Sequence, residues 1–151
     1  MKENVKIEPL TDFFQLEEIE KIEKNNFKNT AFSMRVLEEL YYDERVIILV
    51  GIFQNCISGY VILYNNEDIY DILKIAVKNE FKRKSIGTKL LDYINNNLIK
   101  NRKISIMLEV RENNQRAINF YEKYGFQKIS IRKKYYEDTD EDANIMIYSK
   151  N

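Results

Sequence analysis

Hydrophobic positions in the first third of the chain recur in patterns that predict one strand and two helices. Residues 5–9 alternate between apolar and polar side chains and predict a short opening strand. Apolar residues at helical spacing over 13–23 predict a helix capped at Thr11–Asp12. After the polar stretch 24–31, Ser33 is placed to cap a second, short helix.

The middle of the chain carries a dense β signal. Residues 46–53, 57–64 and 69–77 are rich in β-branched and other apolar side chains and predict three strands. Gln54–Asn55 and Asn65–Asn66 supply the turns between them. Three strands joined by tight turns predict an antiparallel meander.

In the second half, helical and strand periods alternate. The predicted elements are a helix over 86–98, a strand over 104–110, a helix over 115–124 closed by Gly125, and strands over 126–134 and 145–148. The crossover between strands 69–77 and 104–110 should be right-handed, which makes these strands parallel. Because the chain shows no linker and no internal repeat, we expect 1–151 to form a single α/β domain around one mixed sheet.

The composition of the 151 residues narrows the possible functions. Hydrophobic residues make up 44% of the chain, and 24 basic side chains balance 24 acidic ones. This balance argues against a disordered chain. It also argues against nucleic-acid binding by the whole surface, because no surplus of cations exists to displace counterions. We therefore expect no direct nucleic-acid partner.

Two residue counts exclude whole classes of chemistry. The chain contains one cysteine, Cys56, and no histidine. These counts exclude an internal disulfide framework, a cysteine-rich zinc site, a histidine-ligated metal and catalysis by Ser–His–Asp or Cys–His groups. We expect no metal, and we interpret Cys56 as an inert packing residue. Acid–base chemistry must then use carboxylates, tyrosines, lysines or water.

The apolar runs bear on where the protein is found. Met1–Pro9 lacks the apolar core of a signal peptide. No run approaches the roughly 18 uninterrupted apolar residues that a membrane span requires. We therefore expect a cytoplasmic protein with no membrane partner.

The loop at 81–88 combines cations with the start of a predicted helix. Lys82, Arg83 and Lys84 stand beside consecutive backbone N–H groups, an arrangement suited to an anion. The spacing matches neither a Walker A loop nor a dinucleotide-binding fingerprint. A solvated basic turn whose Gly87 eases the bend explains the loop alone equally well. Its position at the carboxyl end of a strand that feeds a crossover favours a binding site.

A resemblance to a known family rests on several linked segments. Ile75-Ala76-Val77 is followed, after four intervening residues, by Lys82-Arg83-Lys84-Ser85-Ile86-Gly87-Thr88. This segment resembles the acetyl-CoA-binding motif of the GCN5-related N-acetyltransferases (GNATs), which is Q/R-x-x-G-x-G/A. The RimI-type branch, the ribosomal-protein alanine N-acetyltransferases, resembles the chain at Leu108-Glu109-Val110-Arg111, Asn114, Ala117-Ile118, Phe120–Phe126, Ile131–Tyr136 and Glu141-Asp142-Ala143. The likeness follows the element order of the whole chain and is dense from about residue 68 to residue 146.

The resemblance implies a GNAT fold: a mixed central sheet with an antiparallel N-terminal meander, a parallel strand pair at the cofactor cleft, and helices on both faces. Acetyl-CoA is the implied co-substrate. The residues implied to bind it are Ile75, Ala76, Val77, Lys82, Arg83, Lys84, Ser85, Ile86, Gly87, Thr88 and Asn114. The resemblance places the general base at Glu109 and the proton donor to the leaving thiolate at Tyr121.

Two positions depart from the family motif. Lys82 stands where the family has glutamine or arginine and keeps the positive charge of arginine. Ser85 stands at the first glycine of the motif, and it costs about 1 kcal/mol if that position requires a positive φ. Weakened but not abolished acetyl-CoA binding is expected. Upstream, Phe32–Ser33 replaces the branch's usual Trp-Ser and lacks the preceding proline, which leaves the acceptor open.

Each candidate residue also has an alternative interpretation. Glu109 is a carboxylate in an apolar strand, where it needs a partner or a raised pKa, and an ion pair with a nearby lysine or arginine would explain it equally well. Tyr121 shares a helical face with Ala117 and Ile118 and could be a core aromatic residue. Asn114 is placed to cap the following helix, and capping alone would account for it.

The pKa of the acceptor amine favours a peptide N-terminus. An α-amine with a pKa near 7.7–8.0 is neutral in roughly one molecule in seven at pH 7, whereas a lysine side chain is neutral only about once in 2,500. The difference is roughly 3.5 kcal/mol. One glutamate is sufficient to deprotonate an α-amine. The family resemblance implies that this amine attacks the thioester directly, in a ternary complex.

The acceptor groove is the least determined part of the site. Phe27, Phe32, Tyr135 and Tyr136 could line a peptide groove, with Glu141 or Asp142 near a cationic N-terminus. Alternatively, the two tyrosines cap the core beside a solvated acidic loop over 137–142. We predict a peptide α-N-acetyltransferase whose partner is a protein N-terminus, such as that of a ribosomal protein. A small-amine acetyltransferase and a non-catalytic acetyl-CoA-binding module are the alternatives, and the sequence leaves the oligomeric state open.

Overall fold

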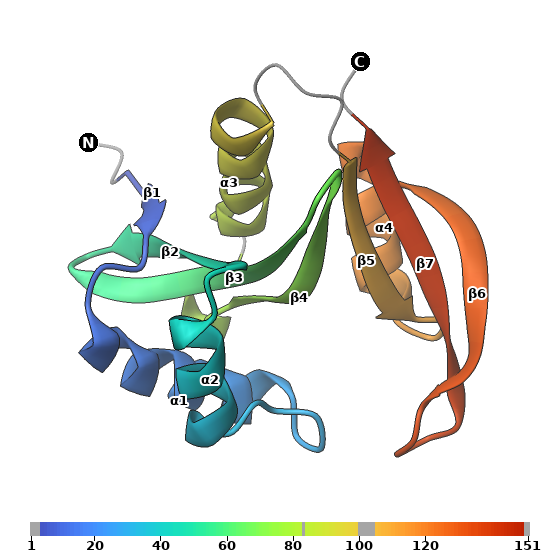
Figure 1. The fold of residues 1–151 in the computed structure, drawn as a ribbon, viewed down its shortest axis with the longest axis horizontal. Coiled ribbons are helices and arrows are strands. Elements are labelled where there is room, and N and C mark those ends of the chain that lie inside the picture. Colours follow the sequence, from blue (N-terminus) through green and yellow to red (C-terminus); the bar gives the residue numbers. More distant parts are fainter. Residues whose placement is uncertain (1–3, 83, 100–104, 150–151) are drawn as a thin grey trace.

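The computed structural model describes residues 4–82, 84–99 and 105–149. Seven strands form one mixed sheet in the order β1-β2-β3-β4-β5-β7-β6, which confirms the predicted α/β class (Figure 1). The strands are β1 (Lys6–Pro9), β2 (Val46–Phe53), β3 (Cys56–Asn66), β4 (Ile69–Val77), β5 (Ser105–Arg111), β6 (Gln127–Tyr136) and β7 (Glu141–Ser149). Among them, only β4 and β5 pair in parallel, as the crossover predicted.

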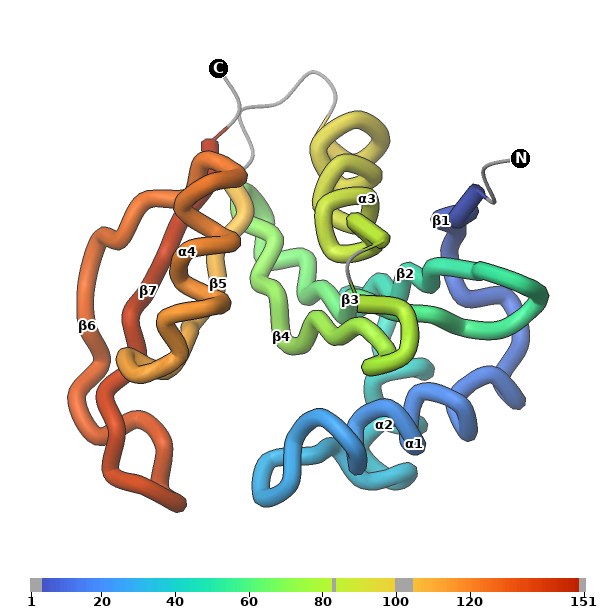
Figure 2. Tube along the Cα trace, turned by 180° about the vertical axis from the view of Figure 1, so that it is seen from behind, coloured from blue at the N-terminus to red at the C-terminus, as the bar shows by residue number. Residues whose placement is uncertain are grey.

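Helices cover both faces of the sheet (Figure 2). The helices α1 (Leu16–Asn26) and α2 (Met34–Tyr42) pack on one face, where Leu16, Ile19 and Leu37 are fully buried. The helices α3 (Ile86–Tyr93) and α4 (Gln115–Tyr124) pack on the other face, which forms a second core cluster. In the described segments no helix combines the length and the apolar character needed to cross a bilayer.

Turn chemistry explains one sequence prediction and corrects another. Gln54 and Asn55 both have positive φ, 53° and 63°, as a tight turn between β2 and β3 requires. The predicted turn at Asn65–Asn66 is wrong, because β3 continues through both residues. The chain turns instead after Asn66, where Glu67 takes φ 54°. Asparagine favours turns, but here pairing with β4 outweighs that preference.

Several predicted boundaries shift. A 3-10 turn, η1 (Phe13–Gln15), precedes α1, and a second, η2 (Asn79–Phe81), follows β4. The helix predicted over 86–98 is α only to Tyr93 and continues as a π-helical segment, η3 (Ile94–Leu98). The strand predicted from 104 runs over 105–111, and position 104 lies outside the described residues.

The sheet opens between β4 and β5 (Figure 1). The two strands pair only where Ile69–Asp71 faces Ser105–Met107. Beyond that point β4 carries a bulge, because Ile72 and Lys74 face consecutive residues of β3 and leave Leu73 unmatched. A bulge bends its strand and ends regular pairing. The carboxyl halves of β4 and β5 therefore diverge.

Candidate functional site

The open edge of β4 presents backbone groups to the gap beside β5. The backbone N–H of Lys78 donates to the Ser58 carbonyl oxygen at 2.8 Å, which makes these residues a hydrogen-bonded pair. Because antiparallel pairing alternates, the backbone groups of Ala76 point towards β3, and those of Ile75 and Val77 point away from it. Of the three predicted cofactor residues on β4, Ile75 is therefore placed to offer both backbone groups in the gap and Val77 its N–H, because the Val77 carbonyl oxygen already accepts a hydrogen bond from Asn26.

The N-terminus of α3 offers a second set of backbone donors. The N–H groups of Ile86, Gly87 and Thr88 lie in the first turn, where an α-helix has no internal acceptors. Ser85 occupies the N-cap position with φ 60° and ψ 26°. Its side chain accepts no capping hydrogen bond within the described part of the chain. Donors left free in this way, together with the helix dipole, favour an anion.

Cations flank this helix start. Lys82 and Lys84 are exposed, and the Lys84 ammonium lies 5.0 Å from the centre of the Phe53 ring. Arg83 belongs to the same prediction but lies outside the described residues. The side chain of Ile86 is buried in the core, so only its backbone can serve a ligand. The loop thus joins positive charge to free main-chain donors.

Gly87 is explained at least in part by packing. A Cβ atom at this position would lie 3.1 Å from Cζ of Phe120, on α4. A glycine therefore allows α3 and α4 to approach closely.

Glu109 lies in surroundings that raise the pKa of its carboxyl. As predicted, Ile106, Leu108 and Val110 of β5 are buried on one face, and Glu109 points to the other. Its Oε1 lies 3.6 Å from a guanidinium nitrogen of Arg132, so the expected ion pair is present. Burial nevertheless raises the pKa of the Glu109 carboxyl; Arg132 opposes this rise. The two interpretations of Glu109, ion pair and raised pKa, hold together.

Asp71 is a site residue that the sequence reasoning missed. It pairs with Met107, and this is the last residue pair before β4 and β5 diverge. Asp71 lies on the face of the sheet that carries Glu109. Its charge adds to the rise in the pKa of Glu109, and burial raises the pKa of Asp71 itself. Its Oδ1 is buried without a hydrogen-bond partner among the described residues. The sequence pattern could have identified this residue, because Asp71 is a carboxylate inside an apolar strand, as Glu109 is.

Tyr121 lies on α4 and is only 8% exposed. Its ring makes edge contacts with Phe120 and Phe126 at centroid distances of 5.3 and 5.4 Å. Burial raises the pKa of the Tyr121 phenol, so this hydroxyl stays protonated at neutral pH. Asn114 caps α4, because its side chain accepts a hydrogen bond from the Ala117 backbone N–H at 3.2 Å. Tyr121 is thus a core residue and Asn114 is a capping residue. The catalytic role of Tyr121 and the cofactor role of Asn114 stay predictions.

Two of the predicted groove residues, Phe27 and Phe32, contact a charged cluster that the sequence did not predict. Phe27 and Phe32 follow α1, and the Lys74 ammonium lies 3.9 and 4.4 Å from the centres of their rings. Lys74 also forms an ion pair at 3.1 Å with Glu23, which is fully buried. Burial lowers the pKa of Lys74, and Glu23 opposes this shift.

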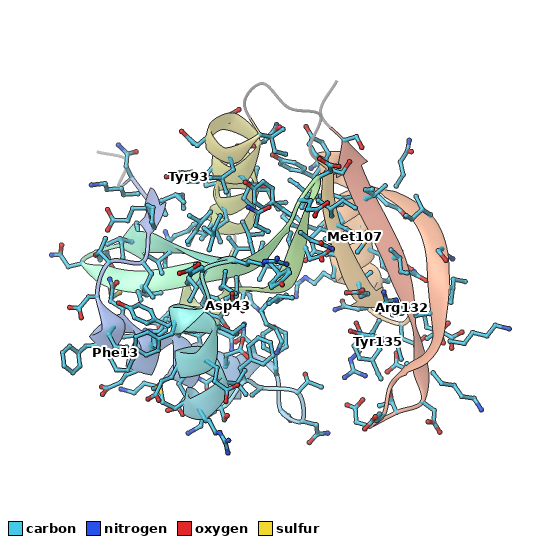
Figure 3. All side chains as sticks on the ribbon, in the orientation of Figure 1. Phe13, Asp43, Tyr93, Met107, Arg132 and Tyr135 are labelled. Atoms are coloured by element: carbon cyan, nitrogen blue, oxygen red, sulfur yellow. The ribbon has the colours of Figure 1, made fainter. Side chains whose placement is uncertain are left out.

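The second pair of groove residues belongs to the β6–β7 hairpin. Tyr136 stacks against Arg111, whose guanidinium carbon lies 4.0 Å from the ring centre. Arg111 also binds both carboxylate oxygens of Asp138, at 2.9 and 3.0 Å. Tyr135 lies beside Arg132, and both are labelled on the inner side of the hairpin in Figure 3. Arg111 thus fixes the hairpin to the end of β5, a role that the sequence did not indicate.

The acidic segment 137–142, which the alternative interpretation took as a solvated loop, is an exposed turn only over 137–140. Glu141 and Asp142 begin β7. Asp142 accepts a hydrogen bond from the Lys134 backbone N–H at 2.9 Å, which is a structural role. Glu141 is 3.5 Å from Arg111 through Oε1, whereas its Oε2 is buried with no partner in the described segments. Of the two carboxylates, Glu141 is the one with an oxygen still to satisfy.

The described residues contain no group of three or more cysteine, aspartate or glutamate side chains arranged to hold a metal ion. Cys56, at the start of β3, donates from Sγ to the Phe53 carbonyl oxygen at 3.2 Å. It packs at the margin of the core that contains α3 and α4.

Comparison with known proteins decides the family. Residues 11–126 match the model of the acetyltransferase (GNAT) family. The chain belongs to the GNAT family. Its seven-stranded sheet, with one parallel pair and helices on both faces, is the GNAT fold that the resemblance implied.

Individual GNAT relatives are similar over different lengths. The [ribosomal protein bS18]-alanine N-acetyltransferase of Escherichia coli (strain K12) is 40% identical over 77 residues, which are 50% of this chain and 52% of that protein. The chain thus matches about half the length of this curated relative. The crystal structure of the ribosomal-protein-S18-alanine N-acetyltransferase from Escherichia coli superposes with a TM-score of 0.86 at 26% identity, over 97% of this chain and 94% of that one. A GNAT family acetyltransferase from Elizabethkingia anophelis with acetyl-CoA bound has a TM-score of 0.79 at 21% identity, over 99% and 100% of the two chains, and shares the fold.

Proposed function

We propose that this protein is an acetyl-CoA-dependent N-acetyltransferase that acetylates the α-amine of a protein N-terminus, as the ribosomal-protein alanine N-acetyltransferases do. One observation carries the proposal. The Glu109 carboxylate, whose pKa is raised, lies on β5 beside the point where the sheet opens. Membership of the GNAT family and the similarity to the Escherichia coli enzyme support it.

Acetyl-CoA would be held by backbone groups on two elements. Ile75 and Val77 of β4 can bond the pantetheine chain and the acetyl carbonyl. The free N–H groups at the start of α3, with the charges of Lys82 and Lys84, suit a pyrophosphate. Acetyl-CoA supplies an activated thioester, so the protein needs to orient it and to move protons.

Two side chains would move those protons. Glu109 accepts a proton from the acceptor amine, directly or through a water, and a raised pKa makes a carboxylate a better base near neutral pH. The neutral amine attacks the thioester carbonyl, the C–N bond forms and the C–S bond breaks, and the attacking nitrogen releases its second proton to solvent. Tyr121 donates its proton to the departing thiolate and regains one from solvent, because a buried phenolate is unfavourable. No covalent intermediate on the protein is required.

A single carboxylate base favours an α-amine as the acceptor. An α-amine needs roughly 3.5 kcal/mol less to lose its proton at pH 7 than a lysine side chain does. The observed arrangement has one ion-paired glutamate, Glu109, and one neighbouring aspartate, Asp71. One carboxylate base of this kind is sufficient to deprotonate an α-amine.

Mass spectrometry of a peptide library with free N-termini, incubated with acetyl-CoA and the protein, tests the proposal. We expect acetylation at α-amines and little on lysine side chains or on spermidine. Glu109→Gln should lower kcat by at least about a hundredfold, in line with general-base catalysis. Tyr121→Phe should reduce kcat with little change in acetyl-CoA affinity. Acetylation of spermidine alone would make the protein a small-amine acetyltransferase, and acetyl-CoA binding without turnover would make it a non-catalytic module.

A further inference from the structure

Lys74 reaches from β4 into a cluster formed by α1 and the segment that follows it. Its ammonium nitrogen lies 3.1 Å from Glu23 Oε1 and donates to the Thr30 carbonyl oxygen at 2.7 Å. The rings of Phe27 and Phe32 lie against the same nitrogen, with centroids at 3.9 and 4.4 Å. The Lys74 side chain is 13% exposed, and Phe27 and Phe32 are half-buried.

The remaining bonds of the cluster converge on Glu23. The Tyr60 hydroxyl donates to its Oε2, and the Phe32 backbone N–H donates to its Oε1 at 2.7 Å. Glu23 and Tyr60 are both fully buried. Two aromatic faces and a buried carboxylate form the kind of cage that binds an ammonium ion. In this protein the ammonium is an internal one.

We propose that Phe27, Phe32 and Glu23 form an ammonium cage that Lys74 fills from within, and that Lys74 thereby excludes acceptors that carry a second cation near the amine to be acetylated. The inference rests on the proposed function, because Phe27 and Phe32 are the predicted wall of the acceptor groove. Lys74 does not touch the reacting atoms. It determines specificity by occupying the cage and by neutralising Glu23.

The position of Lys74 connects this cage to the reaction. Lys74 directly precedes Ile75, whose backbone faces the gap beside β5. A second contact ties the same region to α1, because Asn26 donates from Nδ2 to the Val77 carbonyl oxygen at 3.0 Å. A ligand in the cage would therefore lie beside the strand proposed to hold the acetyl group. Emptying the cage should change which acceptors are used.

The experiment compares two peptides that differ only in their first residue, alanine or lysine. For Lys74→Ala, the ratio of kcat/KM between the alanine and lysine peptides should fall about tenfold from the wild-type ratio. A tenfold change corresponds to about 1.4 kcal/mol, which a desolvated cation–π site can supply. The double variant Glu23→Gln/Lys74→Ala should restore most of that ratio, because its cage has no charge. Lys24→Ala removes an exposed lysine that pairs with Glu20 on α1, and it should leave the ratio unchanged.

A readout without catalysis tests the cage itself. Propylammonium chloride should raise the Tm of Lys74→Ala, compared with sodium chloride at equal ionic strength, and should not do so for the wild type or the double variant. If Lys74→Ala does not fold, Lys74→Gln keeps hydrogen-bond donors for Glu23 and Thr30, and it should change the ratio in the same direction. An unchanged peptide ratio together with no response to propylammonium would overturn the inference. If the wild type acetylates no peptide, the proposed function fails, and the Tm measurement still decides whether the cage exists.

Discussion

Glu109 shows how neighbouring charges set the proton affinity of a single carboxylate. Burial raises its pKa, Arg132 lowers it and Asp71 raises it. Tyr136 also faces this carboxylate, but its own pKa is raised to about 12, so it is neutral near pH 7 and adds no charge. The two ionised neighbours therefore act in opposite directions on one group, and removing each should have opposite effects.

Asp71→Asn and Arg132→Met should move the acidic limb of the kcat/KM profile in opposite directions. A base works when ionised, so a lower pKa moves the limb to lower pH and a higher pKa moves it to higher pH. Asp71→Asn removes a like charge and should move the limb to lower pH, whereas Arg132→Met removes an opposite charge and should move it to higher pH.

The measurement is kcat/KM for one peptide between pH 5.5 and about 9, where the titration of the peptide's own α-amine is common to all variants. Arg35→Met, which removes an exposed charge of α2, serves as the control and should not move the limb. A shift in the same direction for Asp71→Asn and Arg132→Met would show that Glu109 is not the group that titrates.

The start of α3 combines a helix N-terminus with a strained residue. Ser85 has φ 60°, a conformation that costs a residue with a Cβ atom about 1–2 kcal/mol relative to glycine. Ser85 stands at the first glycine of the family motif, and this position does have the positive φ on which the expected cost of a serine depends.

Ser85→Gly should raise the free energy of unfolding by about 1 kcal/mol, because glycine takes this conformation without the Cβ penalty. For a chain of this length the gain corresponds to roughly 2–4 °C in Tm. Acetyl-CoA affinity, measured by isothermal titration calorimetry, should stay the same or tighten. The control Ser33→Gly changes the N-cap of α2, where φ is −73°, and should bring no gain. A lower Tm for Ser85→Gly would mean that the serine side chain makes a compensating contact.

The sequence predicted best those elements whose pattern is local. The meander, the tight turn at 54–55 and the helix closed by Gly125 followed from hydrophobic period and turn chemistry, and all three are observed. The insertion of β7 between β5 and β6 has no local signal, since it depends on pairing between distant residues. The same holds for the cluster around Lys74 and for Arg111, because each is defined by partners on other elements. Glu109 could be identified because a lone carboxylate in an apolar strand is visible in the sequence itself.

The open sheet divides the molecule into two halves, whose described strands pair with each other only between β4 and β5. One half is the meander with α1, α2 and α3, and the other is β5, β6 and β7 with α4 (Figure 1). The halves share one hydrophobic core cluster, and they are also joined by the short parallel pairing between β4 and β5 and by contacts between α3 and α4. Among these contacts, the Tyr124 hydroxyl donates to Asp92 Oδ1 at 2.8 Å. A ligand that bonds β4, α3 and α4 together should therefore stabilise the whole fold.

Tyr124→Phe separates the stability of the two halves from acetyl-CoA binding. Losing this hydrogen bond should cost about 1 kcal/mol of unfolding free energy. Asp92 lies near the end of α3, six residues and about 9 Å from the N–H groups that would bind the pyrophosphate, so the Kd should stay within about twofold. One fixed acetyl-CoA concentration, 100 times the wild-type Kd, should then stabilise both proteins by about 2.7 kcal/mol, equal to within about 0.4 kcal/mol. Thermal unfolding with and without acetyl-CoA checks this equality, and a smaller increment for the variant would show that the contact between α3 and α4 preorganises the acetyl-CoA site.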